Sequence, residues 1–291
     1  MSDSAYFTMP SPFELEPGTL LLLEPSWARA HELRQQLLDM SYPKPFVIDD
    51  GDARYLYFNV SLMQSAMRLT APNALMLAYT RKMMAALLFQ PQPSRIVLIG
   101  LGGGSLLKFC HQQLPGASLE AVELSPEVIA LKGAFKVPAD GPRLQVVEAD
   151  GAEYLAATAK GIDLLLVDAF DRTGFAPDLA NLEFFELAWR QLSGKGVLVV
   201  NLAGDKASYE GLIGVALQAF DQQVIVIPVP EDGNHILFAF KERHFAPRWR
   251  WLQGFAKELR ARHGLDFPDF VEILEKSYRR GAALEAALRG R

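Results

Sequence analysis

Acidic residues follow several predicted strands in the middle of the chain, and a glycine-rich segment precedes them. Ile99-Gly-Leu-Gly-Gly-Gly-Ser105 comes directly after an apolar run, and Glu123, Asp150 and Asp168 each follow a later one. Glycine lets the backbone approach a ligand closely, and a helix N-terminus favours polar or anionic groups. The pattern predicts a site for NAD, FAD or S-adenosylmethionine (AdoMet), or alternatively a tightly packed turn without a ligand.

The first two carboxylates suit the two ends of a nucleoside. Glu123 lies 23 residues after Gly100, where an acidic side chain can accept hydrogen bonds from both ribose hydroxyls. The carboxylate of Asp150, which precedes Gly151, can accept a hydrogen bond from an adenine amino group. The alternatives are a solvated glutamate and an N-cap for a helix at Ala152. The seven residues after Gly100 include no Arg or Lys, which favours a nucleoside with a sulfonium tail over a dinucleotide, although backbone amides can also hold a pyrophosphate.

A pair of carboxylates predicts amine chemistry at the same edge. Asp168 and Asp171 are three residues apart after an apolar strand, and such a pair attracts cations and perturbs carboxylate pKa values. An amine arrives as an ammonium ion and must lose a proton before it attacks. A carboxylate is a weak base for an amine with a pKa near 10, so burial and charge pairing must close the gap, or water takes the proton. The alternative is that Asp168 ends a strand and Asp171 begins a turn before Gly174.

These residues need a parallel sheet to bring them together. Apolar strands are expected at 95–99, 118–123, 144–147, 162–167 and 196–201, each followed by a helical segment. Unbroken apolar strands that alternate with helices indicate an α/β fold with a parallel sheet covered on both faces.

The end of this alternation narrows the fold class. Only five residues join the strand-like runs 224–229 and 235–240, so the two must form an antiparallel hairpin. A mostly parallel sheet with one antiparallel strand is the arrangement of the class I AdoMet-dependent methyltransferase-like, Rossmann-like fold. We expect a small N-terminal β-rich module over residues 1–75, a nucleoside-binding catalytic domain over 76–245 and a C-terminal helical extension over 246–291.

Composition excludes several classes of protein. The 291 residues include 29 Lys and Arg against 34 Asp and Glu, a net charge of −5 that argues against a nucleic-acid binder. A single cysteine, Cys110, excludes an internal disulfide and a multi-cysteine metal site, and no two histidines have metal-ligand spacing, so no metal is expected. No apolar run reaches the roughly 20 residues that span a bilayer, and the N-terminus lacks the pattern of a signal peptide. We therefore expect a cytoplasmic protein without a membrane or nucleic-acid partner.

The motifs together resemble those of the spermidine synthase (polyamine aminopropyltransferase) family over roughly residues 45–240. The resemblance rests on the glycine turn, Val122-Glu123, Asp150-Gly151, Val167-Asp168-Ala-Phe-Asp171 and Gly196-Val-Leu-Val-Val-Asn201. It implies transfer of an aminopropyl group from decarboxylated AdoMet to a diamine, which leaves methylthioadenosine. It also implies no metal or permanently bound cofactor, and a homodimer that binds an adenosyl sulfonium donor and a small-molecule amine.

The resemblance assigns a role to each matching residue. Glu123 would hold the ribose and Asp150 the adenine, while Gln64 would face the nucleoside from the N-terminal side. Asp168 would be the catalytic carboxylate that orients and deprotonates the amine, and Asp171 would help to bind the amine. A loop over 174–182 would close the site. The predicted donor-binding residues are Gln64, Gly100, Gly102, Gly103, Gly104, Glu123, Asp150 and Gly151.

The chain departs from the family pattern mainly on the amine side. Gly103 stands where the family has an Asp that pairs with the donor's ammonium, and Arg172 stands where it usually has Pro. Pro230 replaces a Tyr of the amine pocket, and a family acidic residue before the glycine turn is here Arg81 or Lys82. Two alternatives therefore stay open: an AdoMet-dependent methyltransferase and a non-catalytic nucleoside-binding homologue.

Overall fold

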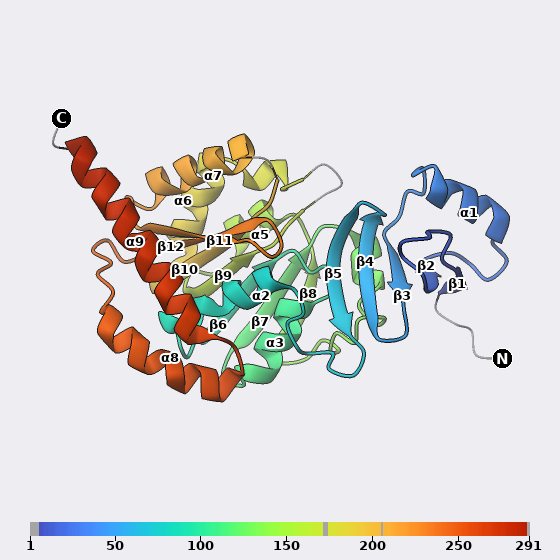
Figure 1. Ribbon diagram of the computed structural model, residues 1–291, viewed down its shortest axis with the longest axis horizontal. Coiled ribbons are helices and arrows are strands. Elements are labelled where there is room, and N and C mark those ends of the chain that lie inside the picture. The colour runs from blue at the N-terminus through green and yellow to red at the C-terminus, as the bar shows by residue number, and fades with distance from the viewer. Residues whose placement is uncertain (1–5, 171–173, 205, 290–291) are drawn as a thin grey trace.

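Two β-sheets and the helices around the larger one make up the protein, as seen in a computed structural model that describes residues 6–170, 174–204 and 206–289 (Figure 1). The strands are β1 (Phe7–Pro10), β2 (Thr19–Leu22), β3 (Phe46–Asp49), β4 (Ala53–Asn59), β5 (Leu62–Arg68), β6 (Arg95–Ile99), β7 (Ser118–Glu123), β8 (Leu144–Glu148), β9 (Ile162–Val167), β10 (Leu192–Leu202), β11 (Val224–Val229) and β12 (Asn234–Phe240). The helices are α1 (Ala30–Leu38), α2 (Ala78–Met83), η1 (Met84–Leu88), α3 (Ser105–Gln113), α4 (Pro126–Ala130), α5 (Gly151–Ala157), η2 (Pro177–Leu179), α6 (Leu182–Gln191), α7 (Lys206–Ala219), α8 (Trp249–His263) and α9 (Phe267–Arg289).

The N-terminal sheet is antiparallel throughout, with its five strands in chain order. One side of it forms a small apolar cluster with α1, which includes Leu33 and Phe46. Its other side packs Val47 and Met67 against Phe135, which follows α4. This second contact fixes the N-terminal sheet to the larger domain and brings its last strand, β5, to the mouth of the site.

The larger sheet has the predicted topology. Its strand order is β11-β12-β10-β9-β6-β7-β8, and the pairs from β10 to β8 are all parallel. Strand β12 runs antiparallel to both β10 and β11, so one strand is reversed. The prediction of a methyltransferase-like sheet is therefore confirmed. The chain order reverses between β6 and β9, and ligands bind beyond the carboxyl ends of strands at such a switch point.

Two apolar layers cover this sheet, one on each face. Alternate residues of the strands point to opposite faces. Leu98 therefore belongs to an apolar cluster with residues of α2, α3, α8 and α9, whereas Val97 belongs to one with residues of α5, α6 and α7. Figure 1 shows α9 crossing the front of the sheet near β10 and β11. The fully apolar strands read from the sequence are thus explained by burial on both faces.

Helix and strand limits differ from the expected ones in a few places. The helix after β7 is short: it ends at Ala130, turns follow it, and Lys136 takes a positive φ of 54°. Strand β5 lacks a clear alternation of apolar and polar residues, and the sequence does not predict it as a strand. It matters here because it carries two residues of the cavity wall.

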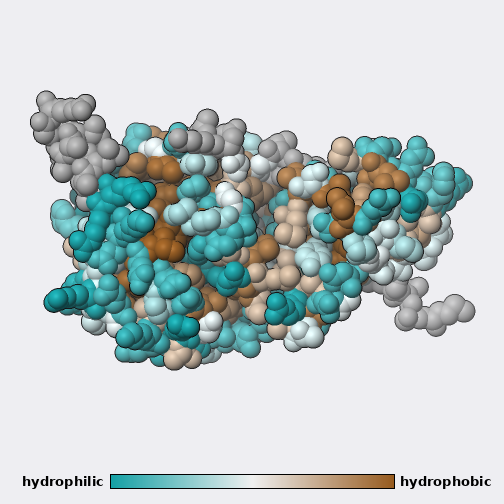
Figure 2. Space-filling model, viewed as in Figure 1, coloured by the Kyte–Doolittle hydropathy of each residue, from teal (hydrophilic) through white to brown (hydrophobic). Residues whose placement is uncertain are grey.

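The surface is mixed in polarity. In Figure 2 hydrophilic residues cover much of the visible face, and hydrophobic surface shows mainly beside α9 and over the N-terminal module. The exposed large apolar residues of that module include Trp27, Leu38 and Met40. Within the described residues, no helix combines the length and apolar character needed to cross a membrane.

Candidate functional site

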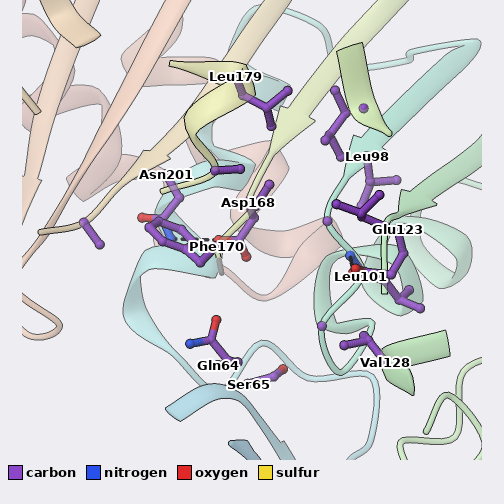
Figure 3. Close-up of a pocket in the computed structure, with 18 of the residues that line it drawn as sticks. Gln64, Ser65, Leu98, Leu101, Glu123, Val128, Asp168, Phe170, Leu179 and Asn201 are labelled. Atoms are coloured by element: carbon purple, nitrogen blue, oxygen red, sulfur yellow. Dashed lines mark hydrogen bonds between the residues drawn. The ribbon is translucent and has the colours of Figure 1, made fainter. Parts of the chain in front are cut away.

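A cavity of about 500 Å³ opens at the carboxyl ends of β6, β7, β9 and β10. Strand β5 of the N-terminal sheet lies across it, so Gln64 and Ser65 face Asp168 from the other side (Figure 3). Of the residues predicted from the sequence, the lining includes Gln64, Gly100, Gly102, Glu123, Asp150, Gly151 and Asp168. The fold therefore brings Asp168 to the same cavity as these predicted nucleoside-binding residues.

The start of the glycine turn is fixed by contacts that leave no room for a side chain. Gly100 has φ +94°, and a Cβ there would lie 2.1 Å from the backbone oxygen of Asp168. The Gly100 N–H donates to the carbonyl of Val122 at 2.8 Å, and the Asp168 N–H donates to that of Ile99 at 2.9 Å. The start of the turn is thereby locked to the two neighbouring strand ends.

Gly103 and Gly104 contribute to the turn without lining the cavity. A Cβ on Gly103 would lie 2.7 Å from Ser65 Oγ and 2.9 Å from the Phe135 ring, and one on Gly104 would lie 2.5 Å from Val137. Ser65 is 5% exposed, and its hydroxyl lies 3.3 Å from that of Ser105. Ser65 therefore fills the space that a side chain at position 103 would take, and neutral hydroxyls stand at this end of the cavity.

Glu123 is oriented by the backbone on both sides of it. Its Oε2 accepts from the Leu101 N–H and its Oε1 from the Ser125 N–H, both at 2.9 Å. Each carboxylate oxygen can accept more than one hydrogen bond, so further acceptor capacity remains for a ligand. Two amide donors thus hold a carboxylate rigidly at the place predicted for a ribose.

Asp150 caps helix α5, as one of the two explanations for it predicts. Its Oδ1 accepts from the N–H groups of Ala152 at 2.8 Å and Glu153 at 2.9 Å. Both hydrogen bonds of the cap are to Oδ1, so Oδ2 can accept a hydrogen bond from a ligand in the cavity. Gly151 packs closely behind it, because a Cβ there would lie 2.5 Å from Ile99. The cap and the predicted adenine contact are therefore compatible.

Asp168 is the centre of a hydrogen-bonded network. The Tyr79 hydroxyl donates to Oδ2 at 3.0 Å, and the Asn201 amide Nδ2 donates to Oδ1 at 2.8 Å. The Asn234 Nδ2 in turn donates to Asn201 Oδ1 at 2.9 Å. Asp168 follows β9 and Asn201 ends the matching part of β10, so neighbouring parallel strands place the two side by side.

The pKa values of both the Asp168 carboxyl and the Tyr79 hydroxyl are raised in this network. Burial in the cavity raises the pKa of the Asp168 carboxyl, and the hydrogen bonds from Asn201 and Tyr79 oppose that rise. Burial, with the nearby charge of Asp168, raises the pKa of Tyr79 well above its usual value. The tyrosine thus stays a hydrogen-bond donor at neutral pH, and Asp168 is a stronger base than an exposed aspartate.

The cavity continues along the segment after Asp168. Phe170 and Phe175 pair as an isolated bridge with their rings 5.7 Å apart, and the Ala176 N–H donates to the Ala169 carbonyl at 3.1 Å. Part of the predicted closing loop therefore lines the cavity, namely Gly174, Ala176, Pro177, Asp178 and Leu179. Asp171 and Arg172, which carry one predicted role and one departure from the family pattern, lie outside the described residues.

The basic residues before the glycine turn are engaged elsewhere. Lys82 is buried and pairs with Glu231 at 2.8 Å, and the Arg81 guanidinium donates to the carbonyls of Leu75 and Met76. Neither basic residue is among the described residues that line the cavity. This departure from the family pattern therefore does not place a cation in the described wall.

Sequence reasoning missed several polar residues of this site, among them Ser65, Tyr79, Asn201 and Asn234. Asn201 had a usable signal, because it ends an apolar strand at the same edge as Asp168. The others come from segments whose alignment with the cavity depends on tertiary packing. Among the described residues, no cluster of three or more His, Cys, Asp or Glu side chains is arranged to hold a metal ion.

Comparison with known proteins agrees with these observations. Residues 76–210 match the spermine/spermidine synthase domain. The chain is 38% identical over 237 residues to a polyamine aminopropyltransferase of Chromobacterium violaceum, which covers 81% of this chain and 90% of that protein. The fold is similar to a probable spermidine synthase of Corynebacterium glutamicum, with a TM-score of 0.61, 22% identity and coverage of 76% and 86% of the two chains.

The same fold also occurs in a methyltransferase. Human methyltransferase-like protein 13, solved in complex with SAH, matches with a TM-score of 0.54 and 21% identity over 69% of this chain and 92% of that one. Fold alone therefore does not separate the two reaction classes. The sequence match extends over most of the length of a curated relative, and the chain belongs to the polyamine aminopropyltransferase (spermidine synthase) family.

Proposed function

We propose that the protein is an enzyme that transfers an aminopropyl group from decarboxylated AdoMet to an amine and releases methylthioadenosine. The observation that carries this proposal is the position of Asp168 within the cavity that also holds Glu123 and Asp150. A nucleoside bound by the latter two would place its sulfonium tail toward Asp168. Membership of the aminopropyltransferase family supports the same assignment.

The reaction is a displacement at the carbon next to the sulfonium. The amine nitrogen attacks this carbon, the C–S bond breaks, and its electron pair goes to sulfur to give the neutral thioether of methylthioadenosine. The nitrogen must lose one proton before or during attack. Asp168 accepts it, or passes it to water, and its raised pKa brings it nearer to that of the amine. Most of the acceleration comes from holding the two reactants in line and from the negative field at Asp168.

One observation favours a second candidate, transfer from AdoMet itself. Because residue 103 is a glycine, the turn carries no carboxylate there, and Ser65 fills the space beside it. Two hydroxyls, those of Ser65 and Ser105, and backbone amides therefore lie at that end of the cavity. These neutral donors suit the carboxylate of AdoMet better than a carboxylate would. Asp168 would repel the same group, which favours the decarboxylated donor. The measured donor decides between aminopropyl and methyl transfer.

The test is mass spectrometry of purified protein incubated with each donor and with putrescine, cadaverine or spermidine. We expect methylthioadenosine and an amine that has gained one aminopropyl group, in equal amounts and only when both substrates are present. A methylated amine and S-adenosylhomocysteine from AdoMet would instead establish the second candidate. Thermal stabilisation by methylthioadenosine with no product from any pair would identify a binding protein and reject both.

Two further parts of the proposal concern the whole assembly. We infer a homodimer located in the cytoplasm, from the family to which the chain belongs and from its charge and composition. Light scattering of the purified protein at several concentrations tests the dimer. Fractionation of the source cells tests the location.

A further inference from the structure

The turn between β11 and β12 contacts both groups that donate to Asp168. Asp232, in this turn, accepts the backbone N–H of Tyr79 on its Oδ2 at 2.6 Å. Asn234, the first residue of β12, donates to Asn201 at 2.9 Å. Tyr79 and Asn201 are 122 residues apart in sequence, yet residues 232 and 234 reach both of them.

The first contact determines where the tyrosine lies. Helix α2 begins at Ala78, and the residue before it, Leu77, offers no side-chain cap. Asp232 supplies that cap from a distant part of the chain, which satisfies a backbone donor and places a negative charge at the helix N-terminus. The capped residue, Tyr79, is the one whose hydroxyl reaches Asp168. Movement of the turn would therefore move that hydroxyl.

The second contact determines which way an amide points. Asn201 has one oxygen and one NH₂ group, and Asn234 occupies the oxygen. The NH₂ group is then the end that faces Asp168. If residue 234 accepted a hydrogen bond instead of donating one, the amide could turn by half a rotation toward it and present its oxygen to Asp168, which would replace attraction by repulsion.

The turn itself is held firmly enough for this role. The Gly233 N–H donates to the Val229 carbonyl at 2.9 Å, and Gly233 adopts φ +75°, a conformation that favours glycine. Next to it, Glu231 pairs with the buried Lys82 of α2 at 2.8 Å. The turn is thus tied to α2 by an ion pair as well as by the helix cap.

We propose that Asp232 and Asn234 are positioning residues for Asp168. Each fixes one of its two hydrogen-bond donors, so a single turn sets both the orientation and the basicity of the carboxylate. The inference rests on the proposed function of Asp168 in amine transfer. It assigns Asp232 no contact with substrate, since that residue does not line the cavity as described.

The first test separates a positioning role from a merely structural one by a double-mutant cycle. Asp232→Ala removes the cap, and we expect kcat to fall about tenfold, the effect of one such hydrogen bond, with KM within twofold. Asp232→Asn retains an acceptor oxygen and should restore most of the rate. In a Tyr79→Phe background, Asp232→Ala should cost little more, because the hydroxyl it positions is already gone.

The second test uses a change that keeps size and reverses hydrogen bonding. Asn234→Asp cannot donate to Asn201, so the amide should turn and the pKa of Asp168 should rise. We expect the acid limb of the kcat profile to move to higher pH, and to move clearly less in an Asn201→Ala background, where only the charge of the new carboxylate acts on Asp168. The control is Gln222→Glu, the same type of change at an exposed residue near the opposite end of the hairpin.

Carboxyl carbon NMR makes the test independent of turnover. The Asp168 signal is assigned by its loss in Asp168→Asn, and its titration is followed in wild type and in Asn234→Asp. A rise in the pKa that is larger than the rise caused by Asn234→Asp in an Asn201→Ala background supports the inference even if no amine is a substrate, in which case only the proposed function fails. An unchanged titration, or rate losses that simply add in both cycles, would overturn the inference while leaving aminopropyl transfer intact.

Discussion

The half of the cavity proposed to bind the nucleoside and the half proposed to bind the amine, called the nucleoside half and the amine half below, are built in different ways. On the nucleoside side the backbone does most of the holding: amide N–H groups fix both oxygens of Glu123 and one oxygen of Asp150. On the amine side, side chains from distant segments hold Asp168, namely Tyr79 from α2 and Asn201 from β10. The first half depends on local turns, whereas the second depends on how remote elements pack.

This difference has consequences for specificity. Contacts made through the backbone survive most substitutions, so a nucleoside site can persist while its neighbours change. A side-chain network changes whenever one of its members changes, so the acceptor can diverge more easily than the donor. The departures from the family pattern at Pro230, at Arg172 and at Arg81 or Lys82 are predicted to concern mainly the amine side, although neither Arg81 nor Lys82 lines the described cavity.

The largest expected effect comes from adding a side chain at Gly100, where the glycine turn lies against the backbone of Asp168. Gly100→Ala would place a Cβ 2.1 Å from the Asp168 backbone oxygen at φ +94°. We expect a loss of about 3 kcal/mol or more in the free energy of unfolding, measured by urea denaturation. Gly161→Ala is the matched control, since it has φ +102° but open space around it. Equal losses in the two variants would show that the close contact between the halves is unimportant.

Lys108, which lies behind the glycine turn, should make the free energy of unfolding depend on pH. Lys108 is buried, donates to the Phe135 carbonyl, and has its pKa lowered to about 8 by burial and by nearby Lys136. The unfolded lysine titrates near 10.5, so between these values the unfolded state holds more protons and folding becomes more favourable as pH rises. Relative to Lys108→Met, the wild type should gain up to about 3 kcal/mol from pH 7 to 11.

Urea denaturation at several pH values measures this gain, and the exposed Lys257→Met serves as the control. Affinity for methylthioadenosine at pH 7 should stay within about threefold in Lys108→Met, because the lysine lies behind the turn. A flat difference between wild type and Lys108→Met across this range would contradict the lowered pKa.

Glu123→Gln should weaken the nucleoside half alone. The new NH₂ group would face one of two backbone N–H donors, that of Leu101 or that of Ser125, and so would not form a hydrogen bond with it. The side chain would also have one acceptor oxygen fewer for the ligand. We expect methylthioadenosine to bind about 10 to 100 times more weakly in calorimetry, with kcat at saturating donor within a few-fold. Glu148→Gln, at the end of the neighbouring strand β8, should change neither. A fall in kcat with unchanged affinity for methylthioadenosine would contradict the assignment of Glu123 to the nucleoside half.

The smallest effect separates the two functions of Asp150. Asp150→Ser keeps an N-cap oxygen but removes the second oxygen, so stability should stay within about 0.5 kcal/mol while methylthioadenosine affinity falls several-fold. Asp150→Ala should in addition lose about 1 kcal/mol of stability with the cap. Wild-type affinity in Asp150→Ser would leave the cap as the only function of this residue.

The same contrast explains what the sequence could predict. The sheet, its reversed strand and the place of Glu123 and Asp168 follow from apolar runs and strand ends, which are local features. Tyr79 and Asn234 could not be placed, because their contacts with the network depend on the packing of α2 and the hairpin against the sheet. Ser65 was missed for a related reason: β5 shows no strand pattern, and its contact with Gly103 joins two separate sheets.

The most direct measurement compares wild type with Asp168→Asn for binding and turnover in the same preparation. Calorimetry gives the affinity for methylthioadenosine, and mass spectrometry gives the rate of aminopropyl transfer. We expect affinity within about threefold and a rate reduced on the order of 10³-fold, because the nucleoside half stays intact while the base is lost. A variant that retains most of its turnover, or that loses nucleoside binding in parallel, would contradict the assignment of Asp168 to the chemistry.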